Sequence, residues 1–124
     1  MIPKENLRVG DRVKAFLLAE RRSTRDFVDL AALLKQLGDE ASLRALEPLN
    51  RLYPAFGALS PISALAEAAE ADPTDLHLVP LDRYKGLQVP FTDWSFVSSE
   101  VRRLTRRLLH QELEAGPTEG GSAS

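Results

Sequence analysis

Residues 13–38, which read VKAFLLAERRSTRDFVDLAALLKQLG, form the most informative segment of the sequence. Its second half carries five apolar residues with the i, i+3, i+4, i+7 spacing of one helix face: Phe27, Leu30, Ala31, Leu34 and Leu37. Ser23 and Thr24 offer hydroxyl groups that can cap the start of such a helix, and Gly38 suits the left-handed position just after its end. We therefore expect a helix over about residues 24–37.

A second helix is expected immediately before this one, over about residues 9–22. Val13, Phe16 and Leu17 form an apolar stripe along it. Asp11 is a candidate N-cap or first-turn acid, since carboxylates are favoured at helix starts. The stretch thus predicts two consecutive helices joined by a short turn.

Residues 39–52 predict a third helix that Pro48 interrupts. Asp39 can cap its start, and four leucines point toward the core: Leu43, Leu46, Leu49 and Leu52. Proline has no backbone N–H and crowds the preceding turn. We expect a kink or break near Glu47.

Two further helices follow. Ser60 and Pro61 provide a cap and a first-turn proline for a short alanine-rich helix that ends at residues 72–73. Thr92 is expected to cap a long final helix over residues 93–114, whose apolar face holds Trp94, Val97, Val101, Leu104, Leu108 and Leu109.

The prolines and glycine within residues 73–92 rule out a long helix there, but the stretch is too apolar for disorder. It is expected to be an ordered strap packed across the helices, and residues 115–124 a flexible tail. No alternating strand pattern extends beyond a few residues. The sequence therefore predicts an all-α fold, a single domain of about five helices over residues 1–114.

The composition excludes several classes of chemistry. The chain has 124 residues, a formal net charge of -2, no cysteine and two histidines. Disulfides, thiolate catalysis and cysteine-ligated zinc are excluded, and we expect no metal site within one chain. No apolar run approaches the ~20 residues of a membrane span, and the first residues lack the apolar core of a secretory signal. We expect a cytoplasmic protein with no membrane partner.

Charge is unevenly distributed along the chain. Residues 8–25 hold six basic and two acidic side chains, whereas residues 39–75 hold two basic and seven acidic ones. A second basic cluster, Arg102, Arg103, Arg106 and Arg107, lies on the final helix. Such a cluster is either a solvated helix face or a contact for phosphate or an acidic partner.

The residues around the first turn of the helix at 24–37 carry the candidate chemistry. Asp26 and Asp29 are three positions apart and can look along one side, while Lys14 approaches from the preceding helix. Acids in a first turn are stabilised by the helix dipole, so they can equally form a cap and a salt-bridge lattice with Arg25.

The pattern K-x3-L-x2-R-x3-R-D-x2-D-L, formed by Lys14, Leu18, Arg21, Arg25, Asp26, Asp29 and Leu30, resembles the fourth motif and its flanks in the AbiEii-type nucleotidyltransferase family, which includes abortive-infection toxins. Residues 73–77 (PTDLH), 82–87 (DRYKGL) and 92–94 (TDW) are similar in order and spacing to the C-terminal part of some members. The resemblance covers roughly residues 7–109.

The resemblance implies a helical C-terminal part that follows a mixed α/β catalytic core, with Lys14 at the triphosphate and Asp26 at an attacking hydroxyl. The chain itself has no Gly-Ser or Gly-Gly element followed by a D-x-D pair, with which such enzymes hold metal and triphosphate. We expect a Lys/Asp half-site that is not an enzyme alone. Magnesium with a nucleoside triphosphate would enter only if another chain supplied the core.

The residues expected to contact a substrate at this half-site are Arg21, Arg22, Arg25, Asp29, Arg83 and Lys85. The last two flank Tyr84, and with Leu87 this segment can instead anchor the strap in the core. The candidate partners are a catalytic-core protein, a second copy of the chain, a nucleotide and tRNA.

Two alternative functions remain open from the sequence. The final helix has a nearly heptad apolar spacing, which suits either a homodimer or protein-interaction module or the core of a monomer. Arg103 and His110 also resemble the Arg and His pair of small helical ribonucleases of the HEPN type, a remote alternative because a histidine near a helix end also interacts favourably with the dipole.

Overall fold

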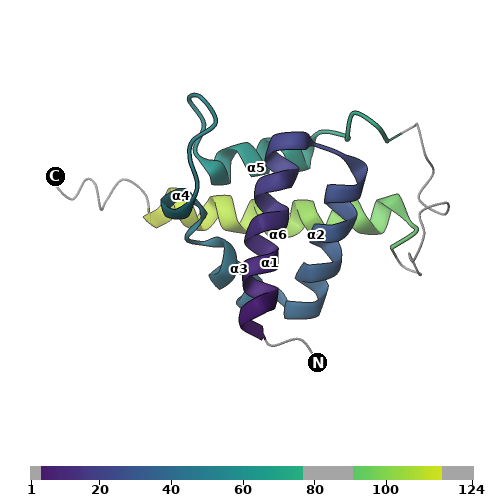
Figure 1. Cartoon of the computed structure of the whole chain (residues 1–124), viewed down its shortest axis with the longest axis horizontal. Coiled ribbons are helices and arrows are strands. Elements are labelled where there is room, and N and C mark those ends of the chain that lie inside the picture. Colours follow the sequence, from purple (N-terminus) through teal and green to yellow (C-terminus); the bar gives the residue numbers. More distant parts are fainter. Residues whose placement is uncertain (1–3, 77–90, 116–124) are drawn as a thin grey trace, which may run out of the picture.

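The computed structural model describes residues 4–76 and 91–115, and within them the fold is all-α (Figure 1). The helices are α1 (Lys4–Arg21), α2 (Thr24–Leu37), α3 (Asp39–Leu46), α4 (Leu49–Leu52), α5 (Pro61–Glu70) and α6 (Trp94–Ala115). In these ranges the one extended pairing is an isolated bridge between Phe56 and Leu59. Within residues 4–76 and 91–115, no helix combines the length and the hydrophobicity that a membrane span requires.

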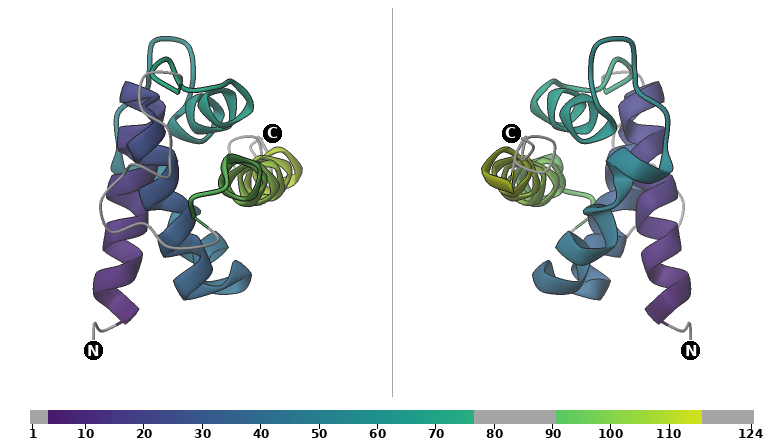
Figure 2. Two further views of the ribbon diagram at one scale, coloured as in Figure 1. Left: turned by 90° about the vertical axis from the view of Figure 1, so that its right-hand side faces the viewer. Right: turned by 90° about the vertical axis from the view of Figure 1, so that its left-hand side faces the viewer.

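The helices form two crossed layers. α1 and α2 pack side by side in one layer, and α5 and α6 form the other, running steeply across the first pair (Figures 1 and 2). α3 contacts α1, α2 and α6 at one end of the molecule. Each layer therefore covers the apolar face of the other.

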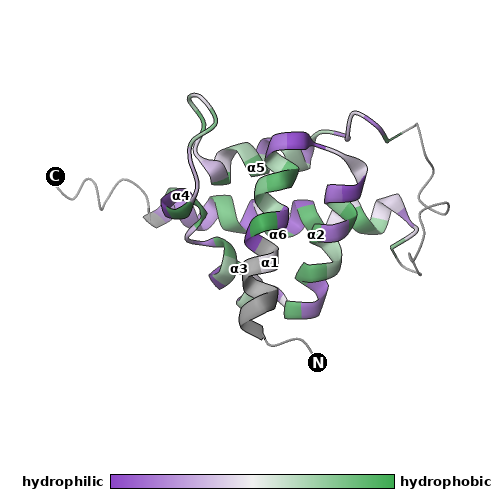
Figure 3. Cartoon of the chain, viewed as in Figure 1, coloured by the Kyte–Doolittle hydropathy of each residue, from purple (hydrophilic) through white to green (hydrophobic). Residues whose placement is uncertain are grey.

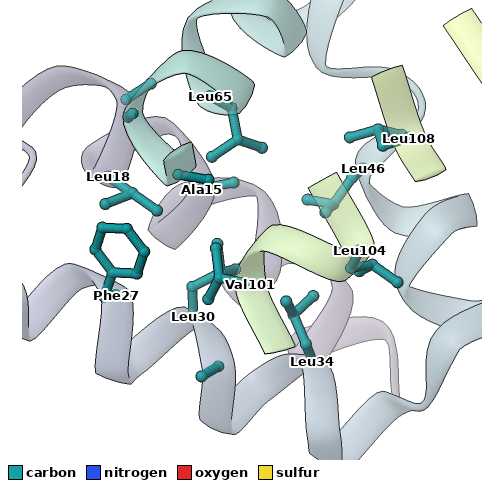
Figure 4. Close-up of a cluster of buried hydrophobic side chains, with 14 of the residues drawn as sticks. Ala15, Leu18, Phe27, Leu30, Leu34, Leu46, Leu65, Val101, Leu104 and Leu108 are labelled. Carbon is teal, nitrogen blue, oxygen red and sulfur yellow. The ribbon is translucent and has the colours of Figure 1, made fainter. Parts of the chain in front are cut away.

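The core lies where the two layers cross. Its large side chains come from every long helix and are at most 1% exposed, among them Leu18, Phe27, Leu30, Leu46, Leu65, Val101, Leu104 and Leu108 (Figure 4). Burying one such side chain contributes roughly 1.5–3 kcal/mol. Four residues of the seam expected for a dimer, Val97, Val101, Leu104 and Leu108, are at most 1% exposed and pack inside a single chain, so they offer no surface to a second copy. Trp94, the first residue of that seam, is half-buried.

The prediction for α2 is confirmed at both ends. The hydroxyl of Ser23 accepts a hydrogen bond from the backbone N–H of Asp26, as an N-cap does. Gly38 has φ 86°, a conformation that L side chains rarely adopt, and its N–H donates to the carbonyl of Leu34.

The orientation expected for α1 is wrong. The helix begins at Lys4 rather than near residue 9, so Asp11 lies in its interior and is not a cap. Val13 is 41% exposed, and Phe16 and Leu17 are only half-buried. The buried face is formed by Ala15, Leu18 and Ala19. Two small residues on that face let α1 approach its neighbours closely, which outweighs the larger side chains of the expected stripe.

The break expected near Glu47 is confirmed, because α3 ends at Leu46 and α4 begins after Pro48. The inward position expected for Leu52 is wrong. That side chain is 55% exposed, since α4 is a single turn and the chain leaves it at Tyr53.

Cap positions at three other helices need smaller corrections. At α3 the N-cap is Gly38, and Asp39 lies in the first turn. α5 begins as expected at Ser60 and Pro61 but ends at Glu70. At α6 the cap is Asp93 rather than Thr92, because the Asp93 carboxylate accepts from the N–H of Ser95.

The strap expected over residues 73–92 is described only at its ends. Pro73 is buried, and residues 74–76 form a turn. The remainder of the expected strap, residues 77–90, and the expected tail beyond residue 115 lie outside the described residues.

Candidate functional site

The candidate site is the α1–α2 corner, which we define as Lys14 and Arg21 from α1 and Arg25, Asp26 and Asp29 from α2. The turn at residues 22–23 reverses the chain between the two helices, so the end of α1 lies beside the start of α2. As expected from the sequence, these charged side chains lie close together, although their pairing differs from the expected one.

Asp26 is the buried anchor of the corner. Its side chain is 0% exposed and accepts hydrogen bonds from Arg21 Nη2 at 2.6 Å, Arg21 Nε at 3.1 Å and Ser23 Oγ at 2.7 Å. Burial raises the pKa of the Asp26 carboxyl, but the hydrogen bonds from Arg21 and Ser23 and the charges of Arg21 and Lys14 lower it by more. The pKa is therefore below its usual range, and Asp26 is ionised at neutral pH.

Asp29 holds the other two cations, one on each carboxylate oxygen. Lys14 Nζ lies 3.0 Å from Oδ2, and Arg25 Nε lies 3.1 Å from Oδ1. The cationic side chains are exposed on their outer sides, Lys14 by 35%, Arg25 by 53% and Arg21 by 55%. Within the corner, three cations thus surround two carboxylates.

Lys14 and Asp26, expected to share a pocket, have different partners. The Lys14 ammonium is hydrogen-bonded to Asp29, while both oxygens of Asp26 are taken up by Arg21, one of them also by Ser23. A groove of about 680 Å³ exists on the molecule, but neither Lys14 nor Asp26 lines it. The corner is consequently a charged surface with a buried acid beneath it.

Arg22 turns away from the corner. Its backbone is left-handed, with φ 54°, and is held by hydrogen bonds from its N–H to the carbonyl of Leu18 (2.9 Å) and from the N–H of Thr74 to its own carbonyl (3.3 Å). Its guanidinium lies 3.7 Å from Glu67 on α5. The structure thus separates Arg22 from the other residues expected at the half-site.

Arg22→Gly is expected to raise the free energy of unfolding by about 0.5–1 kcal/mol. Glycine removes the strain of a left-handed residue with a side chain, which costs about 1–2 kcal/mol in the folded state. It also gives the unfolded chain more conformational entropy, which offsets part of this gain in stability. Urea denaturation measures the change. Arg22→Ala is the control, because it removes the side chain and keeps the strain, so an equal gain in both variants would contradict the backbone explanation.

Asp75 is a member of this region that sequence reasoning missed. Its carboxylate accepts hydrogen bonds from the backbone N–H of Thr24 at 2.7 Å and from the Thr24 hydroxyl at 2.8 Å. Thr24 is 0% exposed, so Asp75 satisfies a buried donor at the start of α2. No local pattern signals this contact, because the two residues are 51 positions apart in the chain.

Arg83 and Lys85, also expected at the half-site, lie outside the described residues. Trp94, expected on the apolar face of the final helix, is half-buried and packs edge-on against Phe27 with ring centroids 4.9 Å apart.

The arginine cluster on α6 is paired with acids of its own chain. Arg103 donates to Asp39 (2.6 and 3.1 Å), Arg106 donates to Glu70 (2.5 and 2.7 Å), and Arg107 also reaches Asp39 (3.1 Å). Arg102 donates to the carbonyl of Ala69 near the end of α5 at 2.6 Å, with a longer contact to Asp72. The acidic segment and the basic helix of the sequence thus neutralise each other.

Arg103 and His110, the pair that suggested a ribonuclease, also contact acidic side chains of the same chain. Arg103 is bound by Asp39 and Glu100, and His110, whose side chain is 73% exposed, lies 3.2 Å from Glu114. Across residues 4–76 and 91–115, no group of three or more His, Cys, Asp or Glu side chains could hold a metal ion.

The lowered carboxyl pKa values predict a loss of stability in acid. The pKa is lowered at Asp39 and Glu70 by hydrogen bonds from Arg103 and Arg106, and at Asp26 as described above. A carboxyl whose folded pKa lies below its unfolded value of about 4 stabilises the fold fully above that value and loses the contribution as the pH falls through the folded pKa. Urea denaturation across pH should therefore show a plateau near neutrality and a decline below about pH 4.

Asp26→Asn should flatten this acid decline and lower stability at neutral pH by about 1–2 kcal/mol, because charge-assisted hydrogen bonds are lost. Asp39→Asn is the exposed counterpart, and its smaller effect should shrink in high salt. An acid decline in Asp26→Asn as steep as in the parent chain would contradict the assignment of Asp26 as the anchor.

In comparisons with known proteins, no family model, curated protein sequence or solved structure matches the chain.

Proposed function

We propose that this chain is a non-catalytic helical module whose α1–α2 corner contacts the phosphates of a nucleotide held mainly by a partner subunit. The proposal follows the resemblance of the corner to the fourth motif of AbiEii-type nucleotidyltransferases. The single observation that carries it is the set of three half-exposed cations held in place by two carboxylates.

The geometry supports anion binding because the cations are ordered before a ligand arrives. Arg21 is fixed by a two-point contact with Asp26, and Lys14 and Arg25 are fixed on Asp29. Side chains that are already ordered lose less entropy on binding. Lys14 uses one of its ammonium donors in this network, which leaves others for a phosphate oxygen.

The same geometry indicates that the catalytic groups come from a partner subunit, because Asp26 is not available as a general base. A general base must reach the proton that it removes, whereas the side chain of Asp26 is 0% exposed and its oxygens already accept three hydrogen bonds. Asp26 serves in this proposal as the residue that holds Arg21, and the chain alone transfers no nucleotidyl group.

Calorimetric titration of the purified chain with ATP and with inorganic tripolyphosphate tests the proposal. We expect weak binding of both at low salt, with affinity that falls as salt is added. Magnesium should weaken it further, because the metal neutralises the phosphates that the cations contact. Lys14→Ala and Arg25→Gln should each lower the affinity about threefold to tenfold.

The control for these variants is Arg107→Gln, which removes one surface cation from the paired cluster on α6. It should leave the affinity unchanged. Absence of any binding at low salt, or an equal loss in Arg107→Gln, would contradict a specific anion site at the corner.

A further inference from the structure

The groove of about 680 Å³ runs along the exposed side of α5 and is separate from the α1–α2 corner. Its lining combines four apolar residues, Leu59, Ala66, Ala71 and Leu109, with Ser63 and three charged residues, Arg22, Glu67 and Glu70. α5 is largely apolar (Figure 3). It runs antiparallel to α6, because the start of α5 is linked through Asn50 to Glu112 near the end of α6, and the end of α5 accepts a hydrogen bond from Arg102. The groove volume lies within the range of about 300–1,000 Å³ that holds bound molecules.

An exposed apolar side chain lies next to this groove. Leu113 is 68% exposed, more than the other two large hydrophobic side chains that are exposed in the described residues, Val13 and Leu52. It follows Leu109 by four positions on α6, so both project from the same face of the helix. The groove and a free apolar side chain therefore stand one helical turn apart.

The charges around the groove are balanced. Glu67, with a side chain 60% exposed, has Arg22 at 3.7 Å, a distance too long for a hydrogen bond. Glu70 is bound by Arg106, whose side chain is 65% exposed. Arg22, Glu67 and Glu70 line the groove, and Arg106 reaches it through Glu70, so the rim carries two charges of each sign. A second copy of this chain, turned by a two-fold axis, can place each acid against an arginine.

We propose that two copies of this chain associate here across a two-fold axis, each inserting Leu113 into the groove of the other. A two-fold interface requires one surface to carry both complementary parts. Here α6 supplies the inserted side chain and one wall of the groove, and exposed Glu67 of each copy meets exposed Arg106 of the other. The partner is a second copy of this chain, and the proposal uses none of the corner residues.

Analytical ultracentrifugation of the full chain from micromolar to millimolar concentration tests this inference. The parent chain should show a monomer–dimer equilibrium. Leu113→Glu should weaken it by about tenfold or more, because a buried leucine is replaced by a charge. Ser63→Trp, which fills the groove, should weaken it without touching Leu113.

The matched control is Leu52→Glu, which places the same charge at another exposed leucine. It should leave the equilibrium unchanged, and circular dichroism establishes that each variant is folded. A parent chain that stays monomeric at every concentration would overturn the inference. So would a dimer that survives both Leu113→Glu and Ser63→Trp, or one that Leu52→Glu disrupts equally.

Discussion

Leu18→Ala is expected to lower the free energy of unfolding by about 2–5 kcal/mol, whereas Leu17→Ala costs less than about 1.5 kcal/mol. The two leucines are neighbours on α1, yet Leu18 is 0% exposed in the core and Leu17 is half-buried. Truncation of Leu18 leaves a cavity between the two helix layers (Figure 4). Urea denaturation of both variants measures the difference.

This pair of variants tests the rotation of α1 about its axis. If the apolar stripe expected from sequence, with Leu17 and Val13 inward, were the buried one, the larger loss would appear in Leu17→Ala. A larger loss in that variant would require α1 to be turned about its axis.

Phe27→Ala is expected to cost about 3–5 kcal/mol, the range for removing a fully buried aromatic side chain. Phe27 is 0% exposed in the first turn of α2, and its ring meets Trp94 edge-on at the start of α6. The variant therefore removes core volume and an aromatic contact between the two layers. Chemical denaturation followed by the fluorescence of Trp94 measures the combined loss of stability.

Phe96→Ala is the control for this prediction. Phe96 is half-buried and packs on Phe91 at the edge of the core, with ring centroids 5.5 Å apart. Its truncation should cost less than half as much. Equal losses in the two variants would contradict the central position assigned to Phe27.

The parts of the fold that follow from local chemistry could be predicted from the sequence. α2 carries its period, its cap at Ser23 and its stop at Gly38 within one short stretch, and Pro48 breaks the following helix where expected. The buried face of α1 could not be predicted. Apolar residues occur at positions 13 and 15–19, nearly all around the helix, so the small residues that face the core are hidden among larger ones.

The candidate site divides in the same way. Spacing alone places Lys14, Asp26 and Asp29 near one another, and the structure brings them together. Spacing does not predict which carboxylate binds Lys14. In the structure the oxygens of Asp26 accept hydrogen bonds from Arg21 and Ser23, and Lys14 is hydrogen-bonded to Asp29 instead.

Contacts between distant segments are outside the reach of local patterns. The sequence shows an acidic middle segment and a basic final helix, but not that Asp39 and Glu70 pair with Arg103 and Arg106. The hydrogen bonds of Asp75 to Thr24 belong to the same class.

A residue-by-residue NMR titration of the isotopically labelled chain with tripolyphosphate shows whether an anion binds at the α1–α2 corner. We expect amide shift changes concentrated around Lys14 and over residues 21–29, with the α6 arginines that pair with Asp39 and Glu70 unaffected. Shift changes centred on those α6 arginines, or none at any residue at low salt, would contradict it.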